Sequence, residues 1–164
     1  MKCIEAGRRP SSKVFLLDTD HCSRLLESDP DVTAQVEANS ASPMATSVIT
    51  EGELLFMAQG SRETTANVKR VSELLMGIRI YQVDSATAAI YGKLKADLYD
   101  RFGPKERAKR RRTTITQLGF GDNDLWIASI ALQNGLIVVS KDTDFPRIRE
   151  VRNLQLASWM RVDA

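Results

Sequence analysis

The stretch that decides the fold is Val14-Phe15-Leu16-Leu17-Asp18-Thr19-Asp20. An unbroken run of four apolar residues is typical of a strand covered on both faces, as in a parallel sheet. The run stops abruptly at two acidic residues. Because ligands of open α/β sheets bind beyond the carboxyl ends of the strands, this stretch predicts both a fold class and a functional edge of the sheet.

Further apolar runs alternate with helical patterns along the rest of the chain. We expect strands near 14–17, 44–47, 78–83, 137–139 and 154–156, and helices near 24–26, 30–39, 50–60, 64–76, 84–98 and 123–134. Asp29 and Asp84 are expected helix N-caps, and Thr50 with Glu53 matches a capping box. This alternation predicts a single α/β domain with a mainly parallel central sheet flanked by helices.

The composition narrows the possible chemistry. The chain has 164 residues and a net charge of +2, with one His and two Cys. One imidazole and two cysteines without a metal-ligand spacing argue against a zinc site, so oxygen ligands are the plentiful ones. The sequence shows neither a membrane-spanning apolar run nor a secretory signal, and we therefore expect a cytoplasmic protein without a membrane partner.

Basic residues gather in two segments outside the expected core. Residues 1–13 are polar and predict a flexible leader before a domain spanning 14–164. A basic loop is expected at about 100–121, since residues 101–112 carry seven Lys or Arg against one Glu. Arg110, Arg111 and Arg112 are candidates for binding the phosphates of a nucleic acid. A solvated loop, or a contact to an acidic partner, is the alternative.

Carboxylates follow two of the predicted strands. Asp18 and Asp20 come after the first strand, and Asp142 and Asp144 follow Val139. If these acids meet in one crevice, their repulsion calls for a cation, and Mg²⁺ or Mn²⁺ is the natural one without a histidine cluster. Since Asp is also favoured in turns and caps, each pair taken alone has a purely structural interpretation.

Two further acids lie on predicted helices. Asp124 precedes Ile127 and Ala128 by three and four residues, which places it over the buried face of its helix. A first-turn acid favoured by the helix dipole is the alternative, and Asp122 fits that role better as an expected N-cap. Glu53 shares a face with Phe56 and Met57, while periodicity alone does not choose between it and Glu51.

Four segments in order resemble one known family. FLLDTD, SVITEGEL, GDNDLWIASIAL and SKDTDF resemble the PIN-domain ribonucleases, most closely the VapC-type toxins of toxin–antitoxin modules. The resemblance implies that the site acids are Asp18, Glu53 in preference to Glu51, Asp124, and Asp142 or Asp144. Asp20 stands where relatives often have Asn, and both the leader and the basic segment are unusually long.

The resemblance also implies an activity and partners. It implies a metal-dependent endoribonuclease whose acids, Asp18, Asp124 and Asp142 among them, hold one or two Mg²⁺ or Mn²⁺ ions that activate water. It further implies a toxin that restrains growth or translation, a cognate antitoxin, an RNA substrate and a homodimer. Residues flanking the acids are candidates for hydrogen bonds to them, to a coordinated water or to phosphate: Thr19, Asp20, Ser47 and Ser140.

Other functions remain open from the sequence. Asp18-Thr19-Asp20 after a strand also looks like the DxD signature of haloacid dehalogenase-like phosphatases, in which Asp18 would be a nucleophile. A catalytically inactive PIN-like module that binds RNA or a partner through the basic loop is a third interpretation. His21 could form a hydrolase dyad, although capping or packing at the first helix explains it more simply.

Overall fold

The computed structural model describes residues 13–160. The expected flexible leader, Lys13 apart, lies outside these residues and stays a prediction. Within the described part, each of the five expected strand segments overlaps an observed strand. These strands are β1 (Phe15–Leu17), β2 (Met44–Ser47), β3 (Arg79–Tyr81), β4 (Ile137–Val139) and β5 (Gln155–Ala157). They form one sheet in the order β3-β2-β1-β4-β5, and every neighbouring pair is parallel. The predicted α/β fold class is confirmed.

The strand order reverses beside the central strand β1. From β1 the chain moves outward to β2 and β3, then crosses to the other side for β4 and β5. β1 and β4 therefore pair directly, with Leu17 opposite Val139. Since connections leave these two strands in opposite directions, their carboxyl ends border a crevice, which is where ligands bind in such sheets.

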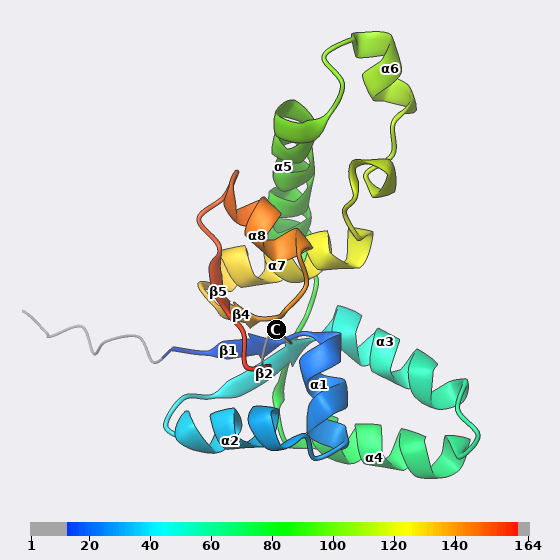
Figure 1. The fold of residues 1–164 in the computed structure, drawn as a ribbon, viewed down its shortest axis with the longest axis vertical. Coiled ribbons are helices and arrows are strands. Elements are labelled where there is room, and N and C mark those ends of the chain that lie inside the picture. The colour runs from blue at the N-terminus through cyan, green and yellow to red at the C-terminus, as the bar shows by residue number, and fades with distance from the viewer. Residues whose placement is uncertain (1–12, 161–164) are drawn as a thin grey trace, which may run out of the picture.

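Helices cover both faces of the sheet (Figure 1). One layer contains α1 (Thr19–Leu26), α2 (Pro30–Ala38), α3 (Val48–Gln59) and α4 (Thr64–Met76), and the other contains α5 (Ser85–Phe102), α7 (Asp122–Asn134) and α8 (Asp144–Arg149). The pleat of β1 divides the core accordingly, because Leu16 packs with the α5 and α7 side chains while Leu17 packs with those of α3 and α4.

Local capping signals are confirmed at two helices and wrong at a third. The side chains of Asp29 and Asp84 accept backbone N–H bonds and cap α2 and α5 as predicted. The capping box of Thr50 and Glu53 does not form, since β2 runs directly into α3 and Ser47 Oγ accepts the bond from the Thr50 N–H at 3.1 Å. Glu53 thus lies in the interior of α3, where its carboxylate is available for other contacts.

The basic segment is structured and contains more than the expected loop. α5 continues to Phe102, and α6 (Arg107–Arg112) and the 3-10 turn η1 (Thr116–Leu118) follow. Residues 103–121 form an arm that carries α6 past the end of α5 and returns to the start of α7 (Figure 1). Helix α8 was also not expected from the sequence. Within residues 13–160, no helix is long and apolar enough to cross a membrane.

Candidate metal centre

Three carboxylates meet at the crevice beside β1 and β4. One oxygen from each of Asp124, Asp142 and Asp144 lies within 4.8 Å of the others. Asp124 comes from the first turn of α7, Asp142 from the connection after β4, and Asp144 from the first residue of α8. Carboxylate oxygens are the ligands that Mg²⁺ and Mn²⁺ prefer, so this group fits a divalent cation.

A chain of hydrogen bonds fixes the connection between β4 and α8. The Asp142 N–H donates to Ser140 Oγ at 3.0 Å, and the Asp144 N–H donates to Asp142 Oδ1 at 2.9 Å. The Gly121 N–H then donates to Asp144 Oδ2 at 2.6 Å, which ties this connection to the start of α7. Ser140, which the sequence proposed as a hydrogen-bonding residue beside the acids, therefore orients residues 140–144 through the backbone of Asp142.

Burial and the crowding of these acids raise the pKa of Asp124 to about 7. Burial is the largest cause, and the charges of Asp142, Asp144 and Glu53 add to it, together with a hydrogen bond to Asp144. The part of this rise that comes from the neighbouring carboxylates reflects crowded negative charge. A bound cation would offset that charge, so the electrostatics of the protein alone fit a divalent ion.

Glu53 faces this cluster from α3. Asn123 Nδ2 donates to Glu53 Oε1 at 2.7 Å, and Thr19 Oγ1 donates to the other oxygen. Glu51 instead lines a hollow beside Leu55 and Met76 on the outer side of the helix. Of the two candidate glutamates, Glu53 is the one placed among the acids, and Thr19 helps to hold it.

Asp18 lies at the neighbouring strand end and is 6% exposed. It is not one of the three acids within 4.8 Å of one another. Its Oδ1 accepts two hydrogen bonds from His21, one from the backbone N–H and one at Nδ1, each 2.8 Å long. Asp20 is exposed, and its Oδ2 lies 3.9 Å from Lys141 Nζ. Ser47 Oγ caps α3 by accepting the Thr50 N–H. Neither residue is one of the three clustered acids.

Two residues that the sequence analysis missed shape the centre. Gly121, rather than Asp122, is the N-cap of α7, and a Cβ there would lie 2.8 Å from Asp124 Oδ2. Any larger residue would therefore push against the Asp124 carboxylate. Asn123 is the second, through its bond to Glu53. The only local signal for either was their position beside Asp124 in the GDND segment.

Asp122 belongs to a separate polar group on the outside of α7. It accepts hydrogen bonds from the Tyr91 hydroxyl at 2.5 Å and from Lys95 Nζ at 3.0 Å. Burial alone would raise the pKa of Asp122, but the bonds from Tyr91 and Lys95 outweigh it and lower that pKa. This acid is therefore excluded as a member of the crowded cluster.

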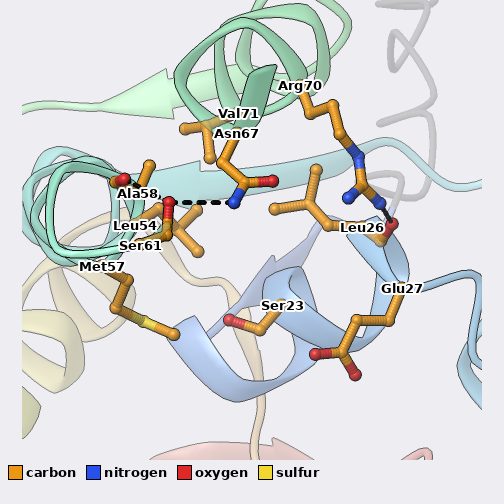
Figure 2. Close-up of a pocket in the computed structure, with 10 residues that line it drawn as sticks. All are labelled: Ser23, Leu26, Glu27, Leu54, Met57, Ala58, Ser61, Asn67, Arg70 and Val71. Atoms are coloured by element: carbon orange, nitrogen blue, oxygen red, sulfur yellow. Dashed lines mark hydrogen bonds between the residues drawn. The ribbon is translucent and has the colours of Figure 1, made fainter. Parts of the chain in front are cut away.

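A mainly apolar groove lies between α1, α3 and α4 (Figure 2). Leu26, Leu54 and Val71 line it, and Met57, which is 53% exposed, stands at its edge. Asn67 Nδ2 donates to Ser61 Oγ at 2.9 Å beside it. This mainly apolar lining does not resemble the acidic centre.

Comparison with known proteins decides the family. The model of the PIN domain matches residues 15–151. The chain belongs to the PIN domain family. This membership confirms the resemblance seen in the four acidic segments and decides against the haloacid dehalogenase-like alternative.

Individual PIN relatives agree with this result. The chain is 27% identical over 140 residues to Ribonuclease VapC2 of Haemophilus influenzae, covering 84% of this chain and 94% of that protein. The DNA-bound VapBC structure from Salmonella typhimurium superposes with a TM-score of 0.73 at 23% identity, covering 90% of this chain and 99% of that one. VapBC2 from Rickettsia felis, bound to a promoter DNA fragment, gives 0.72 at 21% identity, with the same coverages of 90% and 99%.

Proposed function

We propose that this PIN domain is a metal-dependent endoribonuclease that hydrolyses RNA phosphodiester bonds, and that it is the toxin of a toxin–antitoxin pair restraining growth or translation. The observation that carries the proposal is the meeting of the Asp124, Asp142 and Asp144 oxygens within 4.8 Å at the crevice of a PIN fold. The ribonuclease name of a relative aligned over 84% of the chain supports it.

The acids have distinct roles in this proposal. Asp124, Asp142 and Asp144, with Asp18 from the next strand end, would hold Mg²⁺ or Mn²⁺, which supplies an activated water and offsets charge on the scissile phosphate. Both Asp142 and Asp144 are retained, because both contribute to the cluster. Glu53 is fixed by Thr19 and Asn123 at the rim, where its carboxylate can orient the attacking water and accept its proton.

RNA cleavage by the purified protein is the direct test. We expect cleavage with Mg²⁺ or Mn²⁺ and none in excess chelator, and loss of cleavage in Asp18→Asn and Asp124→Asn with folding retained. Asp122→Asn is the matched control, since it changes an acid on the same helix outside the cluster. Wild-type rates in either site variant would refute the assignment, and RNA binding without turnover under any divalent ion would identify an inactive module.

The arm supplies the proposed contact to the RNA backbone. It returns to Gly121 at the edge of the centre and carries exposed Lys109, Arg111 and Arg112 on α6. Arg110 differs from its neighbours because its guanidinium pairs with Asp100 and lies 5.9 Å from the centre of the Tyr99 ring. Arg110 therefore anchors α6 on α5, which leaves the other cations for phosphates.

The role of the arm can be separated from that of the centre by salt dependence. Replacing Lys109, Arg111 and Arg112 by Ala should weaken binding of single-stranded RNA and reduce the slope of log affinity against log salt by about 2. Lys69→Ala is the control, as Lys69 is exposed on α4 in the opposite layer. An unchanged slope in the triple variant would contradict an RNA contact and favour an acidic protein partner.

The proposed protein partners are a cognate antitoxin and a second copy of this chain. Structural relatives include a toxin–antitoxin complex from Klebsiella pneumoniae with a TM-score of 0.60. The groove of Figure 2 and the exposed Phe56 and Met57 on α3 offer apolar surface for such contacts. Met57→Glu should weaken the complex with the protein encoded next to this one, measured by calorimetry with both purified proteins. Equal affinity would exclude the groove.

A further inference from the structure

His21 is a fully buried polar side chain that the proposed chemistry does not use. Its exposed fraction is 0%, although it lies in the first turn of α1 beside the candidate centre. It is also the only histidine in the chain. A buried imidazole needs hydrogen-bond partners for both ring nitrogens. The two partners of His21 therefore indicate which groups it positions.

Both ring nitrogens of His21 are engaged, and the partners define their roles. The backbone N–H of Trp159 lies 3.4 Å from Nε2, and Asp18 Oδ1 lies 2.8 Å from Nδ1. A backbone N–H can only donate, so Nε2 accepts and the ring proton lies on Nδ1, where it is donated to Asp18. The three groups form one directed chain from Trp159 through His21 to Asp18.

The far end of this chain is rigid. Trp159 follows β5, is 7% exposed, and its ring centre lies 5.0 Å from that of Phe15 on β1. Its ring also meets the edge of the imidazole, with centres 6.5 Å apart. The segment after the last strand therefore fixes the orientation of the imidazole, and the rotamer of His21 is set by packing as well as by hydrogen bonds.

The near end leaves one oxygen of Asp18 free for a ligand. Oδ1 accepts both bonds from His21, while among residues 13–160 no hydrogen bond reaches Oδ2. A carboxylate that is only 6% exposed and accepts hydrogen bonds at just one of its two oxygens normally has a further partner. Asp18 lies beside β4, since its N–H donates to Val139 O at 3.2 Å, and β4 leads into Asp142 and Asp144.

We propose that His21 is a positioning residue that holds Oδ1 of Asp18 and thereby presents Oδ2 to the divalent ion. The inference rests on the proposed function and deepens it by assigning a task to the buried imidazole and to the segment around Trp159. Groups that orient a metal-binding carboxylate typically change metal affinity 10–100-fold when removed. His21 acts only through Asp18 and contacts neither RNA nor ion.

The first test uses the wild-type protein without a purification tag. ¹⁵N labelling of histidine gives one imidazole, and we expect the spectrum of the Nδ1–H tautomer. Titration with Mg²⁺ should shift both ring resonances in the wild type and in Asp122→Asn, but not in Asp18→Asn. A proton on Nε2, or resonances indifferent to bound Mg²⁺, would overturn the inference even if variants of His21 failed to fold.

The second test compares two substitutions that preserve different halves of the imidazole. The amide of His21→Asn places a donor at the position of Nδ1, whereas the amide of His21→Gln reaches the position of Nε2 and leaves Oδ1 of Asp18 without its side-chain donor. By calorimetry, we expect Mn²⁺ affinity to fall about tenfold or more in the Gln variant and to be largely retained in the Asn variant.

The outcomes separate this inference from the proposed function. Equal Mn²⁺ affinity in wild type and the Gln variant, or equal losses in both variants, would show that His21 is a packing residue only. Absence of Mn²⁺ binding and RNA cleavage in the wild type would instead refute the proposed function. If the inference holds, saturating Mn²⁺ should restore RNA cleavage in His21→Gln, since only the presentation of the ligand is impaired.

Discussion

The raised pKa of Asp124 makes the stability of the metal-free protein depend on pH. Its value rises from 3.8 to about 7 on folding because of burial and of the charges of Asp142, Asp144 and Glu53. The folded protein thus binds this proton more tightly than the unfolded chain. Its contribution to stability is complete below about pH 4, decreases as the pH rises, and is lost once the pH has passed through the folded value near 7.

The expected loss can be estimated from the width of that interval. Each pH unit between the two pKa values changes the free energy of unfolding by about 1.4 kcal/mol for one proton. Between pH 5 and pH 7 this amounts to about 3 kcal/mol as an upper limit. Because Asp124 is partly exposed, solvent screening reduces the loss to about 1–3 kcal/mol. At about 2–4 °C per kcal/mol, the melting temperature should fall by several degrees.

Denaturation in excess chelator between pH 5 and pH 8 measures this effect. Wild type should lose stability relative to Asp124→Asn, which cannot ionise, and should regain it at pH 8 when Mn²⁺ is added. Asp122→Asn is the control, because the lowered pKa of Asp122 keeps that acid ionised throughout this range. Parallel pH profiles for wild type and Asp124→Asn would refute the reasoning that burial and the neighbouring acids raise the pKa of Asp124 in the metal-free centre.

Four further predictions concern individual residues. Gly121→Ala should reduce Mn²⁺ affinity at least about tenfold by calorimetry, as its Cβ would lie 2.8 Å from a carboxylate oxygen. Gly52→Ala, with open space at its Cβ, should instead stabilise α3 by about 0.5–1 kcal/mol in chemical denaturation. Asn123→Ala should slow RNA cleavage about tenfold with little change in Mn²⁺ affinity, because it frees Glu53. Burial raises the pKa of Cys22 to about 12, so mass spectrometry should find its alkylation at pH 8 only after unfolding.

The elements that could be predicted from the sequence are those specified by local interactions. Asp29 and Asp84 cap their helices through bonds to backbone N–H groups two and three residues away. Gly135 follows α7 with a φ of 65°, a left-handed conformation that glycine adopts readily, so the helix ends within the range expected from the sequence. The apolar strand at 137–139 lies where its run of β-branched residues placed it. For the two helix caps, the deciding contact lies within one turn of the chain.

Contacts distant in the sequence explain what the pattern did not predict. Glu53 resembled a capping residue because Thr50 precedes it by three positions, yet its bonding partners lie 34 and 70 residues away. The arm was expected as a loop, but Arg110 reaches back to Asp100 and fixes α6 against α5. The strand ends account for only part of the cluster, because Asp142 and Asp144 follow β4 whereas Asp124 joins them from the first turn of α7 and Asp18 is not one of the three.

The structural and the functional interpretations of these acids are compatible. Asp18 caps α1 through Oδ1, and Asp124 lies in the first turn of α7, so both stabilise helix N-termini as ordinary acids do. The same positions aim the positive ends of two helix dipoles at the crevice, which offsets part of the repulsion among the carboxylates. At Asp18, one oxygen serves the fold while the other can serve a cation. Burial and the neighbouring charges both raise the pKa of Asp124, and a bound ion offsets the part that comes from those charges. We infer that the pH dependence of stability, compared without and with Mn²⁺, tests the site more directly than loss of cleavage.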